Sequence, residues 1–347
     1  MDNETEPTLR RRRPDRVTVK DVARAAGVAH STVSKALNES KEISEETRAR
    51  ISGIAADLGY RPNTIARGLK SRRSLTLGIV TSDDDGFLST AMARGVAEVA
   101  AEHDYNVFVC DSYGRAELER RHLTMLLDKQ VDAIILAGAT VDHRGGPAVD
   151  TGDIPVAYIY GYTTGLPSPC IVPDDQGGAR LATEHLIGLG RRRIGLVNGP
   201  AREESAQLRL IGYRQALDAA GRQVDYGIIR AGQDWSQHAG YRAARELLGQ
   251  PRPPDAVVCA GDELAAGAIL AFADAGLRVP AEVSVIGFEN RPFGEHLPLP
   301  LSTVSLPLRE IGRLAAQTLL NALDGAPLSY EIIRLPCRLT IRDSCGG

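Results

Sequence analysis

The sequence has few aromatic residues, few cysteines and no long apolar run. Aromatic side chains make up 5% of the 347 residues, with a single tryptophan. The five cysteines are an odd number without a CxxC pair, which suggests neither a disulfide framework nor a zinc site. No stretch approaches the length of a membrane span, and the first 16 residues lack the apolar segment of a secretory signal. We therefore expect a cytoplasmic protein.

Common catalytic motifs are absent as well. The sequence contains no GxxxxGK[ST] phosphate loop, no GxSxG elbow, no HExxH, and no GxGxxG after the first predicted strand. Asp174 with Asp175 and Asp262 with Glu263 are acidic pairs that suit acid–base chemistry. Each pair precedes a predicted helix, however, and helix capping is the simpler interpretation. We predict no catalytic residue, no metal site and no cofactor.

What is present is an ordinary globular composition with uneven charge. At 43% hydrophobic and 24% charged residues, the chain has room for two or three domains. Residues 1–75 carry 16 Lys and Arg against 10 Asp and Glu, whereas the whole chain has a net charge of −3. Only the N-terminal part suits a polyanion. The four arginines at 10–13 are either a phosphate-binding arm or part of a flexible basic tail.

Residues 18–38, TVKDVARAAGVAHSTVSKALN, predict two short helices around a tight turn. Apolar residues recur at helical spacing in both segments, so each helix has one face to bury. Gly27 lies between them and tolerates the positive φ of a sharp turn. The alternative is a plain helical pair within a core. Polar residues face outward on the second helix and suit the reading of base edges: His30, Ser31, Ser34, Lys35 and Asn38.

A third short helix is predicted after Ser44, with Gly59 placed to end it. Its apolar face is predicted to hold Ile51, Ile54, Ala55 and Leu58. Residues 64–70 then form a helix-compatible run of two turns. An isolated helix is only marginal in water at roughly 12–15 residues, so we expect this run to be disordered on its own.

From residue 75 onward, short apolar runs alternate with amphipathic helical stretches. Uninterrupted apolar strands separated by helices indicate parallel strands covered on both faces. The pattern occurs as two series, the second beginning near Cys170, and predicts two doubly wound lobes. The predicted fold class is therefore α/β, with a small all-α headpiece. The runs lie at 75–80, 107–110, 131–136 and 154–159, then at 193–198, 226–230, 255–260 and 283–288.

VTVKDVARAAGVAHSTVSKALN, followed by GYRPNTIARGLK, resembles the headpiece and hinge of the lactose-repressor/galactose-repressor family of bacterial transcription regulators. The resemblance continues to about residue 323. It implies a DNA-binding regulator, most often a repressor, that binds a palindromic operator as a homodimer and responds to a small effector. The two-lobed core by itself resembles periplasmic sugar-binding proteins, so a solute receptor is the main rival. An enzyme that uses the interlobe cleft is a weaker one.

The resemblance also implies the domain organisation. We expect a flexible basic tail at 1–16, a helix-turn-helix headpiece at 17–61, a hinge at 62–73 and a two-lobed core at 74–345. Members of this family cross between the lobes three times. We therefore expect the LSTV strand at 301–304 and the helix at 309–323 to return to the first lobe, and the tail from about 331 to end in the second. The expected lobes are about 74–161 with 292–325, and about 162–291 with 326–345.

The helix-turn-helix geometry and the resemblance assign roles in DNA binding. Base edges are read from the start of the second helix, where His30, Ser31 and Lys35 lie. Leu69 is the expected wedge in the minor groove, followed by Lys70, unless this segment is a plain linker. The residues expected mainly to contact the DNA backbone are Thr18, Thr32, Ser34, Asn38, Tyr60 and Asn63.

By the same resemblance, the effector contacts fall at strand ends and helix starts facing the cleft. Tyr160 and Gly261 stand where sugar-binding members usually have Asp and Asn, which favours a ligand with fewer hydroxyls there, such as a glycoside or another ring-bearing metabolite. Trp235 as a core aromatic and Arg209 as a surface helix residue are the alternatives. The six expected contacts are Leu88, Tyr160, Ser205, Arg209, Trp235 and Glu289.

Overall fold

The structure is a computed structural model that describes residues 17–37, 42–60, 73–83, 85–164, 168–329 and 331–346. The chain forms two compact units, Met1–Ser74 and Leu75–Gly347, which are described separately. Four of the expected DNA contacts lie outside the described residues, as does the arginine run at 10–13. These four are Asn38, Asn63, Leu69 and Lys70.

The first unit is a three-helix headpiece with one small apolar core. Its helices are α1 (Val19–Ala26), α2 (His30–Leu37) and α3 (Glu45–Asp57). Gly27 has φ +66° and ends α1 in the left-handed conformation, as predicted. Ser44 caps α3 by accepting a hydrogen bond from the N–H of Thr47 at 3.3 Å. The buried core residues are Val22, Ala23, Ala26, Val33, Ala36, Ile51 and Ala55.

One expected core residue of the headpiece is on the surface. Leu58 follows the last turn of α3 as its C-cap and is 39% exposed, so its predicted place on the buried face is wrong. Helical spacing alone extends the apolar stripe past the point where Gly59, at φ +68°, turns the backbone away.

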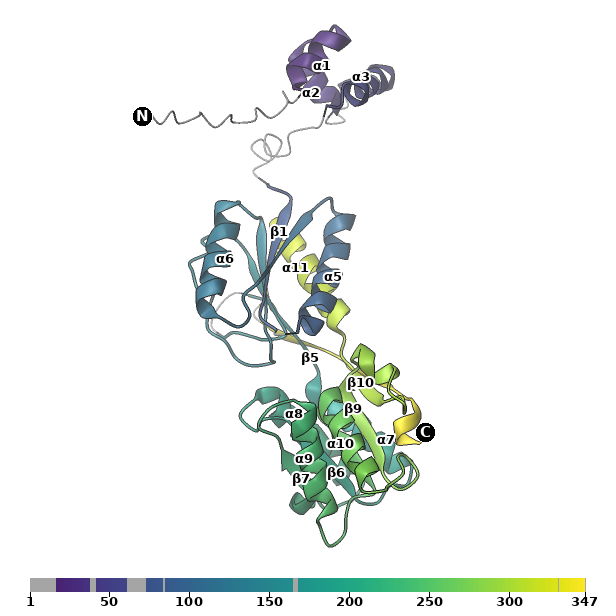
Figure 1. Ribbon diagram of the computed structural model, residues 1–347. Coiled ribbons are helices and arrows are strands. Elements are labelled where there is room, and N and C mark those ends of the chain that lie inside the picture. The colour runs from purple at the N-terminus through teal and green to yellow at the C-terminus, as the bar shows by residue number, and fades with distance from the viewer. Residues whose placement is uncertain are drawn as a thin grey trace, which may run out of the picture. The chain divides into compact units, whose positions relative to one another are not determined.

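The second unit contains two six-stranded sheets, and we name the lobes after them (Figure 1). In lobe 1 the strand order is β11-β5-β4-β3-β1-β2, and every pair is parallel. Its strands are β1 (Thr76–Thr81), β2 (Asn106–Asp111), β3 (Ala133–Ala137), β4 (Val156–Ile159), β5 (Cys170–Pro173) and β11 (Ile332–Leu335). Its helices are α5 (Phe87–Glu102), α6 (Ala116–Asp128) and α11 (Leu308–Leu323).

In lobe 2 the strand order is β12-β10-β9-β8-β6-β7, with β12 antiparallel to β10 and the other pairs parallel. Its strands are β6 (Ile194–Asn198), β7 (Ile229–Ala231), β8 (Ala256–Cys259), β9 (Ser284–Glu289), β10 (Ser302–Ser305) and β12 (Arg338–Thr340). Its helices are α7 (Asp175–Gly188), α8 (Glu204–Ala219), α9 (Gln237–Leu248) and α10 (Asp262–Asp274). Short 3₁₀ turns occupy Tyr226–Ile228, Pro292–Glu295 and Asp343–Cys345.

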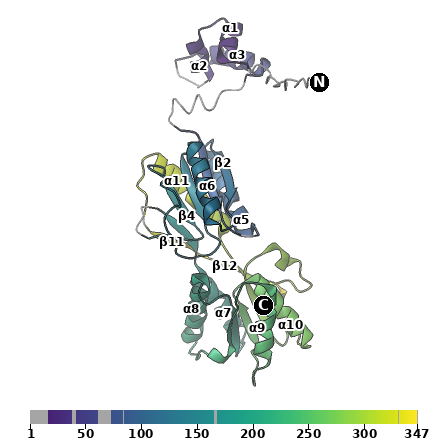
Figure 2. The same cartoon turned by 60° about the vertical axis from the view of Figure 1, so that its left-hand side comes forward.

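The central strands of each sheet are buried on both faces, as their uninterrupted apolar sequences predicted. The prediction is wrong for β2, which lies at the edge of the lobe 1 sheet and is largely exposed despite its apolar VFVC run. On β3, Ile135 packs into the core under α5 and α11, while its neighbours Ile134 and Leu136 pack into the core under α6. Figures 1 and 2 show these helices on opposite sides of the lobe 1 sheet. In lobe 2, α9 packs against α10 and α7 against α8, and these pairs cover the two faces. Successive side chains of a strand point to opposite faces of the sheet, so one apolar strand contributes to the cores on both faces.

The expected assignment of three strands to lobes is wrong. β10, the LSTV strand, pairs with β9 in lobe 2 rather than returning to lobe 1. β5 and β11 pair with each other in lobe 1, although we expected both in the second lobe. Their sequences, CIVP, STVS and IIRL, do not indicate a lobe, because only long-range backbone pairing decides which sheet a short strand joins. Within the described residues the chain passes between lobes after β5, after β10 and after β11.

Candidate functional site

The exposed face of α2 presents the predicted base-reading side chains. Val33 and Ala36 point into the headpiece core, which leaves His30, Ser31 and Lys35 exposed to solvent. The Lys35 ammonium forms an ion pair with Glu42 across the loop that leads to α3. This pair lowers the pKa of Glu42, chiefly because its carboxylate accepts a hydrogen bond from Lys35. Sequence reasoning missed Glu42, because no local pattern places it beside α2.

Two other expected DNA contacts have roles within the headpiece. The Thr18 hydroxyl and backbone N–H both donate to the Asp21 carboxylate, at 2.7 and 2.9 Å, and fix the start of α1. Tyr60 is half-buried, and its side chain packs against the headpiece core. Thr32 and Ser34 on α2 are also half-buried. Among the described residues expected to contact the DNA backbone, Thr18 is therefore exposed, whereas Thr32, Ser34 and Tyr60 are half-buried.

A pocket of about 290 Å³ lies between the lobes, and all six expected effector contacts line it. Leu88 and Tyr160 belong to lobe 1, and Ser205, Arg209, Trp235 and Glu289 belong to lobe 2. We refer to it as the interlobe pocket. Its position at strand ends agrees with the general rule for ligand sites in parallel α/β sheets. Gly261, singled out above as standing where sugar-binding members usually have Asn, also lines it. The lining residues that sequence reasoning did not select as effector contacts are Asp83, Asp85, Ala139, Thr140, Glu263 and Arg291.

Arg209 is not a surface residue but a buried part of the pocket wall. Its Nε and its terminal nitrogen donate to Asp175 Oδ1 at 2.8 and 2.7 Å, and both side chains are at most 2% exposed. The guanidinium lies 4.0 Å from the ring centre of Phe288 and also donates to the carbonyl oxygen of Ala260. Burial is the largest single influence on the pKa of Arg209 and lowers it, but the surrounding acidic groups, Asp175 foremost, together outweigh burial and raise that pKa. The side chain is therefore a fixed cation.

Close helix packing explains why Arg209 and Asp175 meet. Gly212, one turn after Arg209, lies where a Cβ would collide with the carbonyl oxygen of Gln176 on α7. The two helices can approach this closely only without a side chain there. The predicted capping role holds for Asp174, whose Oδ1 accepts the N–H of Gly177 at 2.8 Å. It is wrong for Asp175, which points instead toward α8.

Trp235 forms one wall of the pocket. It is half-buried, and its Nε1 donates to Glu203 at 2.7 Å, so the plane of the ring is held in place. The ring lies directly on the backbone of Gly199, where a Cβ would collide with it. Arg209 lies 5.2 Å from the ring centre. The ring also packs partly against the lobe 2 core, so the alternative of a core aromatic describes one of its faces only.

A charged contact crosses the pocket from lobe to lobe. Arg291 in lobe 2 donates to Glu289 at 2.6 Å and to Asp85 in lobe 1, and its guanidinium lies 4.7 Å from the ring centre of Phe87. Glu289 has φ +105° and Tyr160 has φ +51°, which are unfavourable for residues with side chains. Backbone strain of this kind concentrates at functional sites.

Asp83 and Asp262 support the pocket from either side. Asp83 Oδ2 accepts the N–H groups of Leu88 and Ser89, each at 3.1 Å, and anchors the start of α5. Asp262 is not a helix cap as expected; its two oxygens accept the Thr303 hydroxyl and the Arg291 backbone N–H, each at 2.6 Å. Burial is the largest influence on Asp262 and raises its pKa to about 7.

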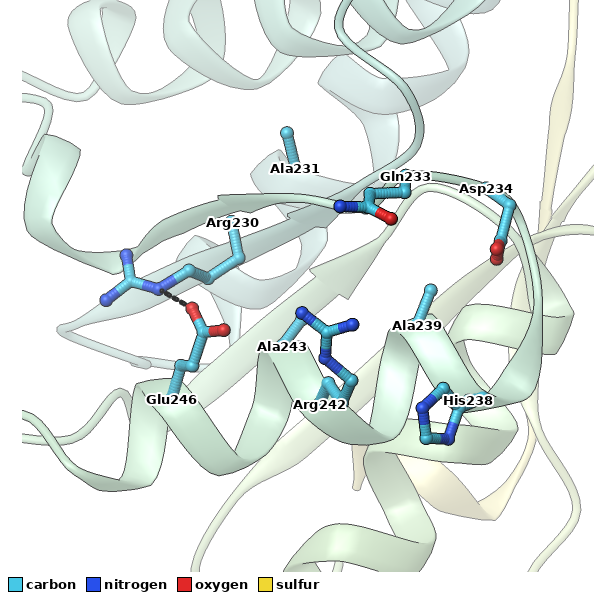
Figure 3. Close-up of a pocket in the computed structure, with 10 residues that line it drawn as sticks. Arg230, Ala231, Gln233, Asp234, His238, Ala239, Arg242, Ala243 and Glu246 are labelled. Atoms are coloured by element: carbon cyan, nitrogen blue, oxygen red, sulfur yellow. Dashed lines mark ion pairs between the residues drawn. The ribbon is translucent and has the colours of Figure 1, made fainter.

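A second, smaller pocket of about 130 Å³ lies between β7 and α9 (Figure 3). Its most prominent contact is the ion pair of Arg230 and Glu246 at 3.0 Å, while Arg242 and His238 reach into it from exposed positions on α9. None of the expected effector contacts lines it. No group of three or more His, Cys, Asp or Glu side chains suited to a metal occurs in the described part of the chain. No described helix is long and apolar enough to span a membrane.

Comparison with known proteins identifies both units. Residues 18–63 match the family "Bacterial regulatory proteins, lacI family", and residues 183–345 match a periplasmic binding protein-like domain. The ribose operon repressor of Haemophilus influenzae is 33% identical over 330 residues, covering 94% of this chain and 98% of its own. The transcriptional repressor CytR of Escherichia coli is 32% identical over 327 residues, with 94% and 96% coverage.

Among solved structures, the lac repressor dimer bound to operator and the anti-inducer ONPF has a TM-score of 0.80 at 28% identity, covering 95% of this chain and 99% of that one. The match therefore spans the headpiece and both lobes. It includes both the unit that contains α2 and the two lobes that form the pocket. The chain belongs to the lacI family of bacterial regulatory proteins, a family of DNA-binding transcriptional regulators rather than enzymes.

Proposed function

We propose that this chain represses transcription by binding a palindromic operator as a homodimer in the cytoplasm, and that a small ring-bearing metabolite in the interlobe pocket controls this binding. The proposal is supported mainly by one observation: the six expected effector contacts come from both lobes and line the same pocket. A ligand that binds residues of both lobes changes the position of one lobe relative to the other. A coupling of about 1–3 kcal/mol then changes operator affinity roughly 5–150-fold.

On the headpiece, we assign base reading to His30, Ser31 and Lys35. Their exposure at the start of α2 supports the assignment, because helix-turn-helix proteins read bases from there. Lys35 reaches guanine or phosphate as a point charge. The proposed backbone contacts are Thr18, Thr32, Ser34, Asn38, Tyr60 and Asn63, with Leu69 and Lys70 acting in the minor groove.

The proposed dimer is supported by an exposed apolar edge. β2 is the last strand of the lobe 1 sheet, and its Phe108 and Val109 side chains are 46% and 57% exposed. Open strand edges with exposed apolar residues invite pairing with another chain. A two-fold dimer also places two headpieces on two half-sites, as a palindrome requires.

The experiment that tests the proposal begins with selection of an operator from random DNA by the full chain. Monosaccharides and nucleosides are then screened for those that raise the Tm and shift operator affinity. We expect Trp235→Ala to abolish the response to such a compound while operator affinity without it is retained. Arg242→Ala, in the smaller pocket, is the matched control and responds as the parent does. A parental response in Trp235→Ala places the effector elsewhere.

Base reading has its own test in the same assay. Lys35→Ala is expected to cost roughly 1–3 kcal/mol of operator binding and to relax preference at one base pair per half-site. A lost phosphate contact instead weakens binding to all sequences alike. An unaltered sequence preference after Ala substitution at 30, 31 and 35 together would refute the assignment.

A further inference from the structure

The interlobe pocket contains more negative charge than its arginines neutralise. As described above, Arg209 and Arg291 are both already paired with carboxylates of the protein. Two more acidic residues line the pocket, Asp83 from lobe 1 and Glu263 from lobe 2. Neither has an ion-pair partner within the described residues. A ligand that enters this pocket therefore meets an excess of carboxylates.

Asp83 carries the clearest sign of a missing partner. The residue is 5% exposed and its Oδ2 accepts the two N–H groups at the start of α5, which hold the side chain rigidly. Its Oδ1 is buried and has no hydrogen-bond donor in the described part of the chain. A buried charged acceptor without a donor is costly. Because Asp83 lines the pocket, a bound ligand is the natural source of that donor.

We infer that the effector, on the proposed function of this pocket, is a small ring that carries a protonated amine, such as an amino sugar, whose ammonium group donates to Asp83. A hydroxyl would supply a donor but leave the excess charge uncompensated, whereas an ammonium group supplies both. Glu263 adds negative potential from the opposite lobe. Phosphorylated or carboxylated ligands are repelled.

The remaining walls of the pocket fit a single ring. Its volume of about 290 Å³ lies near the lower end of the range of small-molecule sites, roughly 300–1,000 Å³. Trp235 and Tyr160 supply aromatic surface from lobe 2 and lobe 1, on which the apolar face of a sugar ring can pack. Ser205 and Thr140 supply hydroxyls for the other ring substituents.

The test uses matched ligands with the full chain at pH 6, where the amines are protonated. The probes are D-glucosamine, D-galactosamine and D-mannosamine, each with its parent hexose, and D-glucose 6-phosphate. In titration calorimetry we expect one aminohexose to bind at least tenfold more tightly than its parent hexose, and the phosphate not to bind. Equal or tighter binding of a parent hexose or of the phosphate overturns the inference, as does a lack of binding by all three aminohexoses.

Two matched variants locate the preference. Asp83→Asn keeps a carbonyl oxygen for the N–H groups at the start of α5 but removes the charge, and is expected to lower the preference for the amine at least tenfold. Asp128→Asn removes an exposed carboxylate at the end of α6, outside the pocket, and is expected to keep that preference. An undiminished preference in Asp83→Asn overturns the assigned contact.

Failure of this inference can be separated from failure of the proposed function. A neutral or phosphorylated hexose that binds and changes operator affinity overturns the amine inference and leaves the proposed function standing. A pocket-bound aminohexose that leaves operator affinity unchanged supports the ligand class and contradicts the proposed control of DNA binding.

Discussion

The interlobe pocket and the exposed face of α2 both place a cation beside a carboxylate, but with opposite degrees of burial. The Arg209 and Asp175 side chains are 2% and 0% exposed, whereas those of Lys35 and Glu42 are 49% and 67% exposed. A buried pair cannot lose one member without leaving a desolvated charge, so its geometry is permanent. An exposed pair gains little and exchanges partners readily. The proposed ligand site is thus preorganised, while Lys35 on the proposed DNA-reading face is free to exchange Glu42 for a phosphate.

The largest effect is expected at the buried pair. Arg209→Met leaves the Asp175 carboxylate buried without its partner and is expected to lower the free energy of unfolding by about 3–5 kcal/mol. Adding Asp175→Leu removes the orphaned charge and is expected to restore most of that loss. Urea unfolding of the single and double variants measures the difference. If Arg209→Met is as stable as the parent, burial of the Arg209–Asp175 pair does not make it more important for stability than an exposed pair.

A pH effect is expected next, at Asp262 behind the pocket. Burial raises its pKa to about 7 in the folded chain, above the ordinary value of 3.8. Between these values the folded state holds a proton that the unfolded state has released, so stability falls as pH rises, by about 1.4 kcal/mol per pH unit at most. From pH 5 to 7 we expect this group to contribute a loss of about 2 kcal/mol. The loss should be absent from Asp262→Asn, and equal pH profiles for parent and variant contradict it.

The contact between Asp85 in lobe 1 and Arg291 in lobe 2 should contribute less to stability. Asp85 is 54% exposed at its side chain and Arg291 only 17% exposed, so the pair is intermediate between the other two. Asp85→Asn is expected to change the free energy of unfolding by about 0–1 kcal/mol, because Arg291 keeps Glu289 as its partner. Small-angle scattering with and without a bound ligand then reports whether the contact restricts lobe movement. If Asp85→Asn lowers the free energy of unfolding as much as Arg209→Met does, the Asp85–Arg291 contact behaves energetically like a buried pair, which contradicts this prediction.

The smallest change in stability is expected in the headpiece. Glu42→Gln removes an exposed carboxylate and should leave the Tm unchanged, while it frees Lys35 for DNA. Because phosphate contacts release counterions, operator affinity should rise by roughly a few-fold at low salt and less at high salt. Fluorescence anisotropy at two salt concentrations measures this. Weaker operator binding in Glu42→Gln shows instead that the pair orients Lys35 productively.

The sequence predicted most of the helices and strands, and the six residues that the resemblance assigns to effector binding line the interlobe pocket. Strand ends of parallel sheets gather at one edge, so residues that follow apolar runs were the right place to look. Asp83 follows β1 in the same way, as Thr140 follows β3 and Arg291 follows β9, so the same rule indicates all three. Asp175 could not be assigned, because the approach of α8 to α7 at Gly212, rather than the local pattern, decides which of two adjacent acids caps the helix.

The lobes to which β5, β10 and β11 belong could not be predicted from the sequence, for a different reason. Their sequences, CIVP, STVS and IIRL, share no pattern, and nothing in any of them indicates which sheet the strand joins. Partners such as Ile332 and Cys170 lie far apart along the chain, and no local propensity records their pairing. Glu42 was missed for a related reason, because its partner Lys35 belongs to another element.

Because the chain passes between the lobes three times within the described residues, neither lobe can complete its fold early in translation. β1 to β5 emerge first, but the lobe 1 core also needs α11, whose Ile311, Ala315 and Leu319 are fully buried in it. The sheet likewise gains its last strand only with β11, so lobe 1 is unfinished until residues 332–335 have left the ribosome. Lobe 2 lies between these parts in the sequence and lacks only β12 and the closing turn. The later lobe therefore reaches its native core almost as early as the first, and premature termination before residue 308 leaves lobe 1 with an uncovered apolar face.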